Sequence, residues 1–303
     1  MLESNEENLN EMNSKVNIAL LLPIFNAEKH LAETLKSIQN QSMKNFNLLI
    51  IDDNSKDDSA SIALEFCLNN TNFSFIQNNK NIGMINNFIF GVTKLKEMCP
   101  DAQFFSLIGQ DDLYEEKWLE RNSISLNTNP KAIASQSHVK YFWNDGRSAE
   151  IRNDDLNCWL NLYKIYRYED DKGNNNRYTI FIHGLIKMSF VDKYFIETEK
   201  YVESLFLLEQ FIVCLFVIEG GICGPEELLM YKRKLDKGNG SDWNLKYPDS
   251  SFSAKLNSKR NRIFATIMIL KNHKSISFRV YFSLCLYAWY RGLKPSISRL
   301  VNK

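Results

Sequence analysis

Strand-like and helix-like patterns alternate through the first 130 residues of this chain, and that alternation limits the folds it can adopt. Each short apolar run is followed by a longer segment with helical periodicity. The strands are predicted at residues 16–22, 48–51, 73–76 and 104–108, and the helices at residues 27–39, 55–67, 85–95 and 115–126. Because a helix follows every strand, right-handed crossovers should join parallel neighbours. The pattern predicts an α/β fold with a mainly parallel central sheet flanked by helices.

Beyond Pro130 the pattern is less regular. Residues 132–142 and 179–186 are interpreted as strands, and residues 204–218 as a helix. Gly220-Gly221 should turn the chain into a last strand that ends near Tyr231. The intervening residues 144–177 are polar and rich in Asn and Asp, which indicates a long loop with a short helix.

Charge is distributed unevenly, although the formal net charge of the 303 residues is only +1. Residues 255–303 contain 11 Lys or Arg and no Asp or Glu. The first 254 residues therefore contain the other 26 of the 37 basic residues and all 36 acidic ones. With its interspersed aromatic residues, this segment predicts a helix lying on an anionic membrane surface. The alternative is a packed pair of helices with solvated cations. Nucleic acid is not an expected partner.

Cysteine usage and hydropathy indicate a cytoplasmic protein. The six cysteines form no CxxC pair and lie mostly in apolar segments, which favours reduced thiols. Residues 1–14 are polar and acidic, so we expect a disordered N-terminus and no signal peptide. The most apolar stretch, residues 204–223, is interrupted by charged and amide side chains, so no transmembrane helix is expected. Binding of the basic segment would place the protein on the inner face of the cell membrane.

Two pairs of acids, Asp52-Asp53 and Asp111-Asp112, follow apolar runs directly. Parallel strands end at one edge of a sheet, where open α/β sheets bind ligands. Carboxylates at this edge suit a ligand with hydrogen-bond donors and a divalent cation.

Four motifs in order and spacing carry a family resemblance. They are Pro-Ile-Phe-Asn-Ala-Glu at 23–28, Ile-Asp-Asp-Asn-Ser at 51–55, Asn-Ile-Gly at 81–83 and Gln-Asp-Asp at 110–112. Over approximately residues 15–235, the chain resembles the family-two inverting glycosyltransferases of the GT-A fold, of the bacterial surface-glycan type. The resemblance implies a GT-A domain at residues 15–240, with a nucleotide-binding half at 15–130 and an acceptor half at 131–240, and leaves residues 241–303 as a basic helical C-terminal extension.

The implied activity is metal-dependent, inverting transfer of a sugar from a nucleotide-diphosphate donor to a hydroxyl of a surface polysaccharide or lipid-linked glycan. Gly109 stands where many relatives carry a further Asp, and Glu209 stands where Asp is more usual. Both departures motivate the alternative of a catalytically inactive binding or scaffold subunit.

The resemblance also implies how the donor nucleotide is held. Its base and ribose would be lined by Pro23, Phe25, Asn26 and Glu28. Asp52 or Asp53 would accept a base N–H, although Asp53-Asn54-Ser55 could also form a turn and a helix cap. Asn81 and Gly83 would lie beneath the diphosphate sugar, where glycine permits close approach of the backbone. An ordinary turn that opens a helix is the alternative for this second pair.

By the same resemblance, Asp111 and Asp112 would bind Mg²⁺ or Mn²⁺ that bridges the two phosphates, with Asp111 also close to the nucleotide. A solvated turn is the alternative. The general base is expected to be Glu209, 11 residues before Gly220, with Glu203 as the alternative.

Three further residues resemble the parts of the family that lie around the acceptor and the diphosphate. His183 could face the acceptor. Lys232 and Arg233 resemble a flexible basic loop that closes over the diphosphate. A structural histidine and an exposed basic turn are the alternatives.

Overall fold

The computed structural model describes residues 17–151, 182–195, 212, 215–216 and 219–234. The chain divides into two compact units, residues 1–236 and 237–303, and every described residue belongs to the first. Several sequence predictions lie outside the described residues. These are the N-terminus 1–14, most of the loop 144–177, Glu203, Glu209 and the basic segment 255–303.

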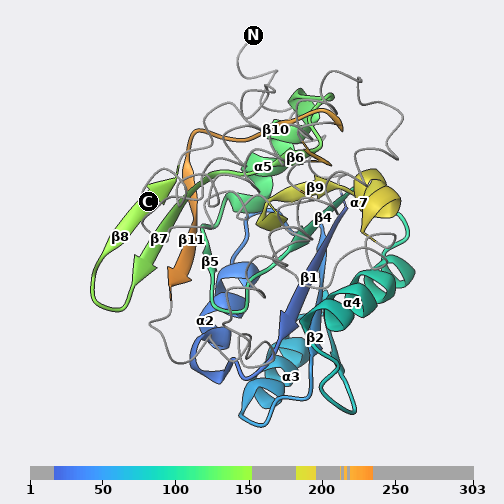
Figure 1. Ribbon diagram of the computed structural model, residues 1–303, viewed down its shortest axis with the longest axis vertical. Helices are drawn as coiled ribbons and strands as arrows, with labels where there is room; N and C mark the ends of the chain where they lie inside the picture. The colour runs from blue at the N-terminus through green and yellow to red at the C-terminus, as the bar shows by residue number, and fades with distance from the viewer. Residues whose placement is uncertain (1–16, 152–181, 196–211, 213–214, 217–218, 235–303) are drawn as a thin grey trace, which may run out of the picture. The chain divides into compact units, whose positions relative to one another are not determined.

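The first unit is built on a seven-stranded sheet of order β10-β6-β9-β4-β1-β2-β3 (Figure 1). At its centre lie β1 (Ile18–Ile24), β2 (Phe46–Asp52) and β4 (Phe104–Leu107), with β3 (Phe73–Gln77) at one edge. These four strands are parallel, as predicted. The far side consists of the short strands β6 (Ala134–Ser135), β9 (Leu185–Lys187) and β10 (Ile222–Cys223). Only β9 runs antiparallel to its neighbours in this sheet as described.

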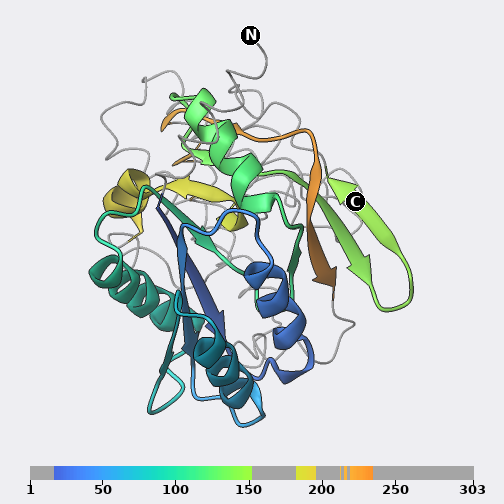
Figure 2. The ribbon, with the colours of Figure 1, turned by 180° about the vertical axis from the view of Figure 1, so that it is seen from behind.

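Helices cover both faces of this sheet, as Figures 1 and 2 show from opposite sides. The predicted helices correspond to α2 (Glu28–Gln39), α3 (Ser59–Asn69), α4 (Met84–Met98) and α5 (Trp118–Thr128). Leu31, Leu35 and Ile38 form the buried face of α2. On the opposite face of the sheet, α4 comes close because Gly91 has no side chain; a Cβ there would lie 2.7 Å from Leu21 Cδ1.

A second sheet, of order β5-β11-β7-β8, lies beside the first and was not predicted. It contains β5 (Leu113–Tyr114), β7 (His138–Trp143), β8 (Ser148–Ile151) and β11 (Leu228–Lys234). β11 pairs antiparallel with β5 and parallel with β7. The strand predicted at 132–142 is therefore two strands in two sheets.

The strand predicted at 179–186 is described only from residue 182 onward. A helical turn at Ile182 and His183 precedes β9, and the short helix α7 (Met188–Tyr194) follows it. Among the described residues, Cys67, Cys99 and Cys223 carry free thiols. No helix within the described ranges combines the length and apolarity needed to cross a membrane.

Candidate donor site at the carboxyl edge of the sheet

The two acid pairs emerge at one edge of the sheet because β2 and β4 both lie next to β1 and run parallel to it. Ile24, the last residue of β1, is in register with Asp52. The Asp53 N–H donates to Ile24 O (2.9 Å), and the Ile108 N–H donates to Leu21 O (2.8 Å). The three strands thus end together, and the predicted shared edge is confirmed by their topology.

Reciprocal hydrogen bonds join the loops that follow β1 and β2. The Asn26 N–H donates to Ser55 Oγ (2.9 Å), and the Lys56 N–H donates to Asn26 Oδ1 (3.0 Å). Glu28 is joined to the same loop, since the Asp58 N–H donates to Glu28 Oε2 (3.1 Å) and the Glu28 N–H donates to Asp57 Oδ2 (3.1 Å). Asn26 has a φ of 47°, a left-handed conformation that asparagine tolerates. Asn26 and Glu28 are exposed on this paired platform.

Two of the nucleotide predictions concern residues next to the platform. Phe25 is half-buried, and the side chain of Gln110 binds its main chain. Pro23 lies within β1, in register with Ile51.

Asp52 and Asp53 are both buried, and protein groups donate hydrogen bonds to both carboxylates. Asp52 accepts bonds from the Ser55 N–H (3.1 Å), the Ser55 hydroxyl and Gln77 Nε2 (2.7 Å). The helix predicted to start at Ser55 starts at Ser59 instead, because Ser55 is engaged by Asp52 and by the Asn26 N–H. Contact of either carboxylate with a base remains a prediction.

Asp53 fixes the loop that precedes α4. Its carboxylate accepts hydrogen bonds from the Ile82 N–H (2.8 Å), the Gly83 N–H (2.9 Å) and Asn78 Nδ2 (3.0 Å). Gly83 has a φ of 84°, and a Cβ there would meet no atom within 4 Å. Glycine is therefore required for backbone conformation, and close approach of this backbone to the diphosphate sugar stays a prediction. The exposed Asn81 caps this turn by accepting a 3.1 Å bond from the Gly83 N–H.

Gln110 connects the acid loop after β4 to the loop after β1. Its Oε1 accepts a hydrogen bond from the Phe25 N–H (2.9 Å), and its Nε2 donates to Phe25 O (3.4 Å). The Thr34 hydroxyl on α2 donates to Gln110 O (3.2 Å). This role was not predicted, because nothing in the sequence indicates which main chain an amide will bind.

Asp112, directly before β5, is fully buried and makes an ion pair with a residue of the neighbouring strand β11. Its Oδ2 lies 2.8 Å from Lys232 Nζ on β11. Its Oδ1 is buried and has no hydrogen-bond partner among the residues that the structure describes. Gly109 provides the space for this carboxylate, since a Cβ at position 109 would lie 2.8 Å from Asp112 Cγ and closer still to Oδ2. A side chain at position 109 would therefore require the Asp112 carboxylate to move.

The surroundings of Asp111, next to Asp112, disfavour a negative charge on its carboxyl group. Burial, followed by the negative charge of Asp112, raises the pKa of Asp111 to about 6. The charges of Lys232 and Arg233 oppose this rise but do not cancel it.

His183 and Lys232, predicted separately, are in contact. His183 Nδ1 lies 2.8 Å from Leu107 O. A carbonyl only accepts, so Nδ1 carries the proton and Nε2 is the acceptor, 3.3 Å from Lys232 Nζ. Burial, and then the charge of Lys232, lowers the pKa of His183 to about 4, which keeps the ring neutral. Burial alone would lower the pKa of Lys232, but Asp112 and Asp111 raise it overall.

Arg233 is also held in place. Its Nη2 lies 2.6 Å from Glu33 Oε2, its Nε donates to Asp111 O (3.3 Å), and its guanidinium stacks 4.7 Å from the Phe142 ring centre. The side chain of Arg233 is only 9% exposed. Lys232 and Arg233 thus lie in a strand, β11, and the expectation that they form a flexible loop is wrong for these residues because they are paired with β7.

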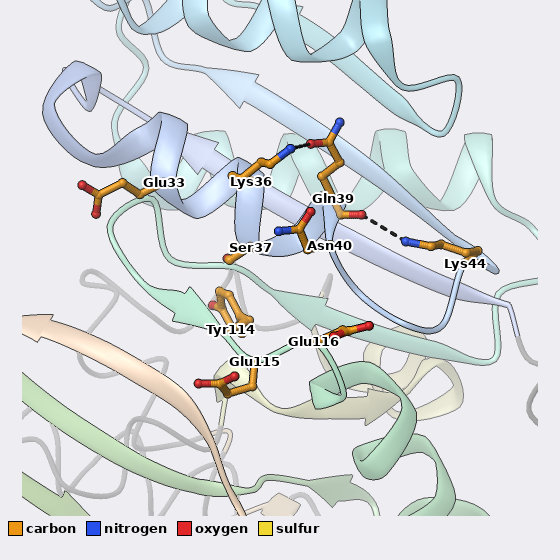
Figure 3. Close-up of a pocket in the computed structure, with 9 residues that line it drawn as sticks. All are labelled: Glu33, Lys36, Ser37, Gln39, Asn40, Lys44, Tyr114, Glu115 and Glu116. Atoms are coloured by element: carbon orange, nitrogen blue, oxygen red, sulfur yellow. Dashed lines mark hydrogen bonds between the residues drawn. The ribbon is translucent and has the colours of Figure 1, made fainter.

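A cavity of about 630 Å³ lies between α2, the residues that lead into β2, and residues 114–116 (Figure 3). It is lined by side chains of both charges: Glu33, Lys36, Ser37, Gln39, Asn40, Lys44, Tyr114, Glu115 and Glu116. None of the predicted site residues lines it. Its connection to the acid edge is Glu33, which binds Arg233.

The acid edge fits a hard divalent cation that takes part of its coordination from a ligand. Carboxylate oxygens are suitable donors, and the unpartnered Asp112 Oδ1 has an unused acceptor capacity. Within the described residues, no three His, Cys, Asp or Glu side chains gather as a ligand set. The protein would therefore supply Asp111 and Asp112, while phosphate oxygens and water would complete the shell.

Comparisons with solved structures agree with the predicted GT-A fold. Staphylococcus aureus TarS 1–349 in complex with UDP-GlcNAc superposes with a TM-score of 0.64 at 14% identity, over 92% of this chain and 73% of that one. The mannosyltransferase PcManGT from Pyrobaculum calidifontis, in complex with GDP-Man and Mn²⁺, superposes with a TM-score of 0.55 at 10% identity, over 91% of this chain and 70% of that one. The fold prediction is confirmed.

Sequence comparison assigns the family. An uncharacterized glycosyltransferase of Haemophilus influenzae is 26% identical over 123 residues, which are 41% of this chain and 36% of that protein. The matched region spans about a third of the length of such curated relatives. The model of the family described as glycosyl transferase family 2 matches residues 19–195, which is more than half of the chain. This chain belongs to glycosyl transferase family 2.

Proposed function

We propose that this chain transfers a sugar, with inversion, from a nucleoside-diphosphate donor to a hydroxyl of a surface polysaccharide or lipid-linked glycan, and that it uses Mg²⁺ or Mn²⁺. The single observation that carries the proposal is the joint placement of Asp111, Asp112 and the paired loops after β1 and β2 at one sheet edge. The UDP-GlcNAc and GDP-Man complexes of proteins with the same fold support a donor of this class.

The exposed platform suits the nucleoside part of the donor. Phe25 offers an aromatic surface, while Asn26 and Glu28 offer polar groups to a base and ribose. In this proposal Asp52 and Asp53 act mainly by shaping the loops, because their buried carboxylates already accept protein hydrogen bonds. Pro23 supports the platform from within β1. Asn81 and Gly83 would then lie under the diphosphate sugar.

The acids and the basic strand suit the diphosphate. A cation bound at Asp111 and Asp112 would supply Lewis-acid stabilisation of the charge that develops on the departing nucleoside diphosphate. Lys232 and Arg233 add fixed positive charge at the same edge. His183 is assigned to holding Lys232, because its acceptor nitrogen faces the ammonium.

The remaining roles fall on residues outside the described ranges. Glu209, or alternatively Glu203, is proposed to remove the proton from the acceptor hydroxyl. Residues 15–240 would form the catalytic domain. Residues 255–303 would hold the protein on the anionic inner face of the cell membrane, beside a lipid-linked acceptor.

The experiment is a panel of nucleotide sugars incubated with the whole protein and Mn²⁺, with release of nucleoside diphosphate as the measurement. We expect slow hydrolysis of one donor, which Asp112→Asn and Glu209→Gln should each reduce at least about 100-fold. Asp101→Asn, which changes an exposed acid in the turn before the amino end of β4, serves as the matched control and should retain full turnover. Nucleotide binding that is unaffected by Asp112→Asn, together with no turnover of any donor, would instead indicate the scaffold subunit.

A further inference from the structure

The ion pair between Lys232 and Asp112 places a positive charge where the proposed function needs a divalent cation. Lys232 Nζ is 2.8 Å from Asp112 Oδ2, and this carboxylate is the proposed cation ligand. The side chain of Asp112 is 0% exposed, while that of Lys232 is 20% exposed. The bond is therefore shielded from water and from dissolved salt.

His183 holds the ammonium from a second side. The hydrogen bond between His183 Nδ1 and Leu107 O fixes the ring, so that Nε2 presents a lone pair to Lys232 at 3.3 Å. Lys232 is thus held between one oxygen and one nitrogen acceptor. Its backbone is held as well, because it pairs with Tyr141 of β7.

A divalent cation cannot bind Asp112 without affecting this ammonium. An ion on Oδ2 would take the atom that Lys232 already uses. An ion on the unpartnered Oδ1 would lie within a few ångströms of the ammonium, on the other oxygen of one carboxylate. Like charges repel strongly at such distances when water does not separate them.

We propose that Lys232 and the divalent cation compete for Asp112, so that cation binding releases the Lys232 ammonium from the carboxylate. The inference rests on the proposed function, in which Asp112 binds the cation, and adds that β11 carries an internal competitor. The released ammonium would remain at the sheet edge, where the diphosphate is proposed to lie. Cation binding and the placement of a phosphate-binding charge would then be coupled.

The test is titration of the whole protein with Mn²⁺ alone, followed by calorimetry or by the electron paramagnetic resonance signal of free Mn²⁺. Lys232→Met should bind Mn²⁺ about 10- to 100-fold more tightly than the unaltered protein, since a charge-assisted hydrogen bond no longer opposes binding. Lys234→Met is the matched control on the same strand. Lys234 Nζ lies 4.5 Å from the Tyr141 ring centre, and its removal should change Mn²⁺ affinity less than about twofold.

Asp112→Asn separates the two levels of the proposal. Loss of Mn²⁺ binding in Asp112→Asn, with unchanged or weaker binding in Lys232→Met, would overturn the competition and leave the cation site intact. If neither the unaltered protein nor Lys232→Met binds Mn²⁺, both the competition and the proposed cation site are overturned. Binding by Lys232→Met alone supports the competition directly.

A second measurement avoids the case in which Lys232→Met fails to fold. Amine acetylation of the unaltered protein, quantified by mass spectrometry, reports how available each lysine is. Saturating Mn²⁺ should increase labelling of Lys232 at least about threefold, because its ammonium leaves a buried ion pair. Labelling of Lys94, paired with Glu97 on the surface of α4, should not change. Equal or reduced labelling of Lys232 would contradict the proposal.

Discussion

Asp111→Asn should stabilise the protein without ligand, although Asp111 is a proposed binding residue. Burial and the adjacent Asp112 raise the pKa of Asp111 from 3.8 to about 6, so an ionised Asp111 is less favourable in the folded than in the unfolded chain. A pKa difference of this size corresponds to ~3 kcal/mol, and partial solvent access reduces the expected gain to about 1–2 kcal/mol.

The sign of the pH dependence follows from the direction of this shift. The folded chain holds the Asp111 proton more tightly, so between about pH 4 and pH 6 it binds more protons than the unfolded chain does. The contribution of Asp111 to folding stability therefore falls as the pH rises through this window. At pH 7.5 its unfavourable effect is fully present, and the asparagine variant removes it.

The measurement is urea unfolding at pH 7.5 and pH 4.5, followed by tryptophan fluorescence. Asp111→Asn should be about 1–2 kcal/mol more stable than the unaltered protein at pH 7.5, and the difference should shrink markedly at pH 4.5. Asp101→Asn, exposed in a turn, should show a difference below about 0.5 kcal/mol at both values. A variant that is less stable at pH 7.5, or whose gain does not depend on pH, would contradict a raised pKa of Asp111 in the folded chain.

Three further predictions concern residues of the same edge. Gly109→Ala should cost about 1–3 kcal/mol in urea unfolding, since its Cβ would overlap the Asp112 carboxylate, and a cost within error of zero would contradict the packing described. Gly83 and Gly146 have φ of 84° and 85°, so Gly83→Ala and its matched control Gly146→Ala should each lower the free energy of unfolding by about 1–2 kcal/mol. Only Gly83→Ala should also weaken nucleotide binding in a thermal-shift titration. Equal effects of the two variants on binding would argue against a role of the loop at residue 83. The pKa of His183 is lowered from 6.5 to about 4, so its contribution to folding stability rises with pH between about 4 and 6.5. In urea unfolding, the stability of His183→Gln should lack this rise. If the variant keeps the rise, another group causes it.

The parallel core of the fold could be predicted because apolar runs and helical periodicity are local signals. Strand β1 is buried on both faces, and its sequence Ile-Ala-Leu-Leu-Leu-Pro-Ile is almost entirely apolar. The second sheet could not be predicted as a sheet, although parts of β7 and β11 were predicted as strands. Its strands β5 and β8 have two and four residues, and β11 finds its partner β7 far away along the chain. The antiparallel direction of β9 was likewise unpredictable, because periodicity carries no information about direction.

The candidate site was predictable at the level of residue types and not at the level of contacts. Acids after strands indicated a shared edge, and the strand order placed them there. Whether an acid faces a ligand or the protein depends on neighbours distant in sequence. Asp53 illustrates this, since its partners are main-chain groups of Ile82 and Gly83. The contact between His183 and Lys232 joins residues 49 positions apart and has no local signal.

The pairing of β5 with β11 has a further consequence for how this chain could diversify. Tyr114 is in register with Met230, and the Glu115 N–H donates to Leu229 O (2.9 Å). The residues just after the acid pair and those just before Lys232 are therefore held side by side by main-chain hydrogen bonds. Because these ends are already fixed, a longer connection between β8 and β9 adds little entropic cost. Insertions there could vary among relatives without moving Asp112 away from Lys232.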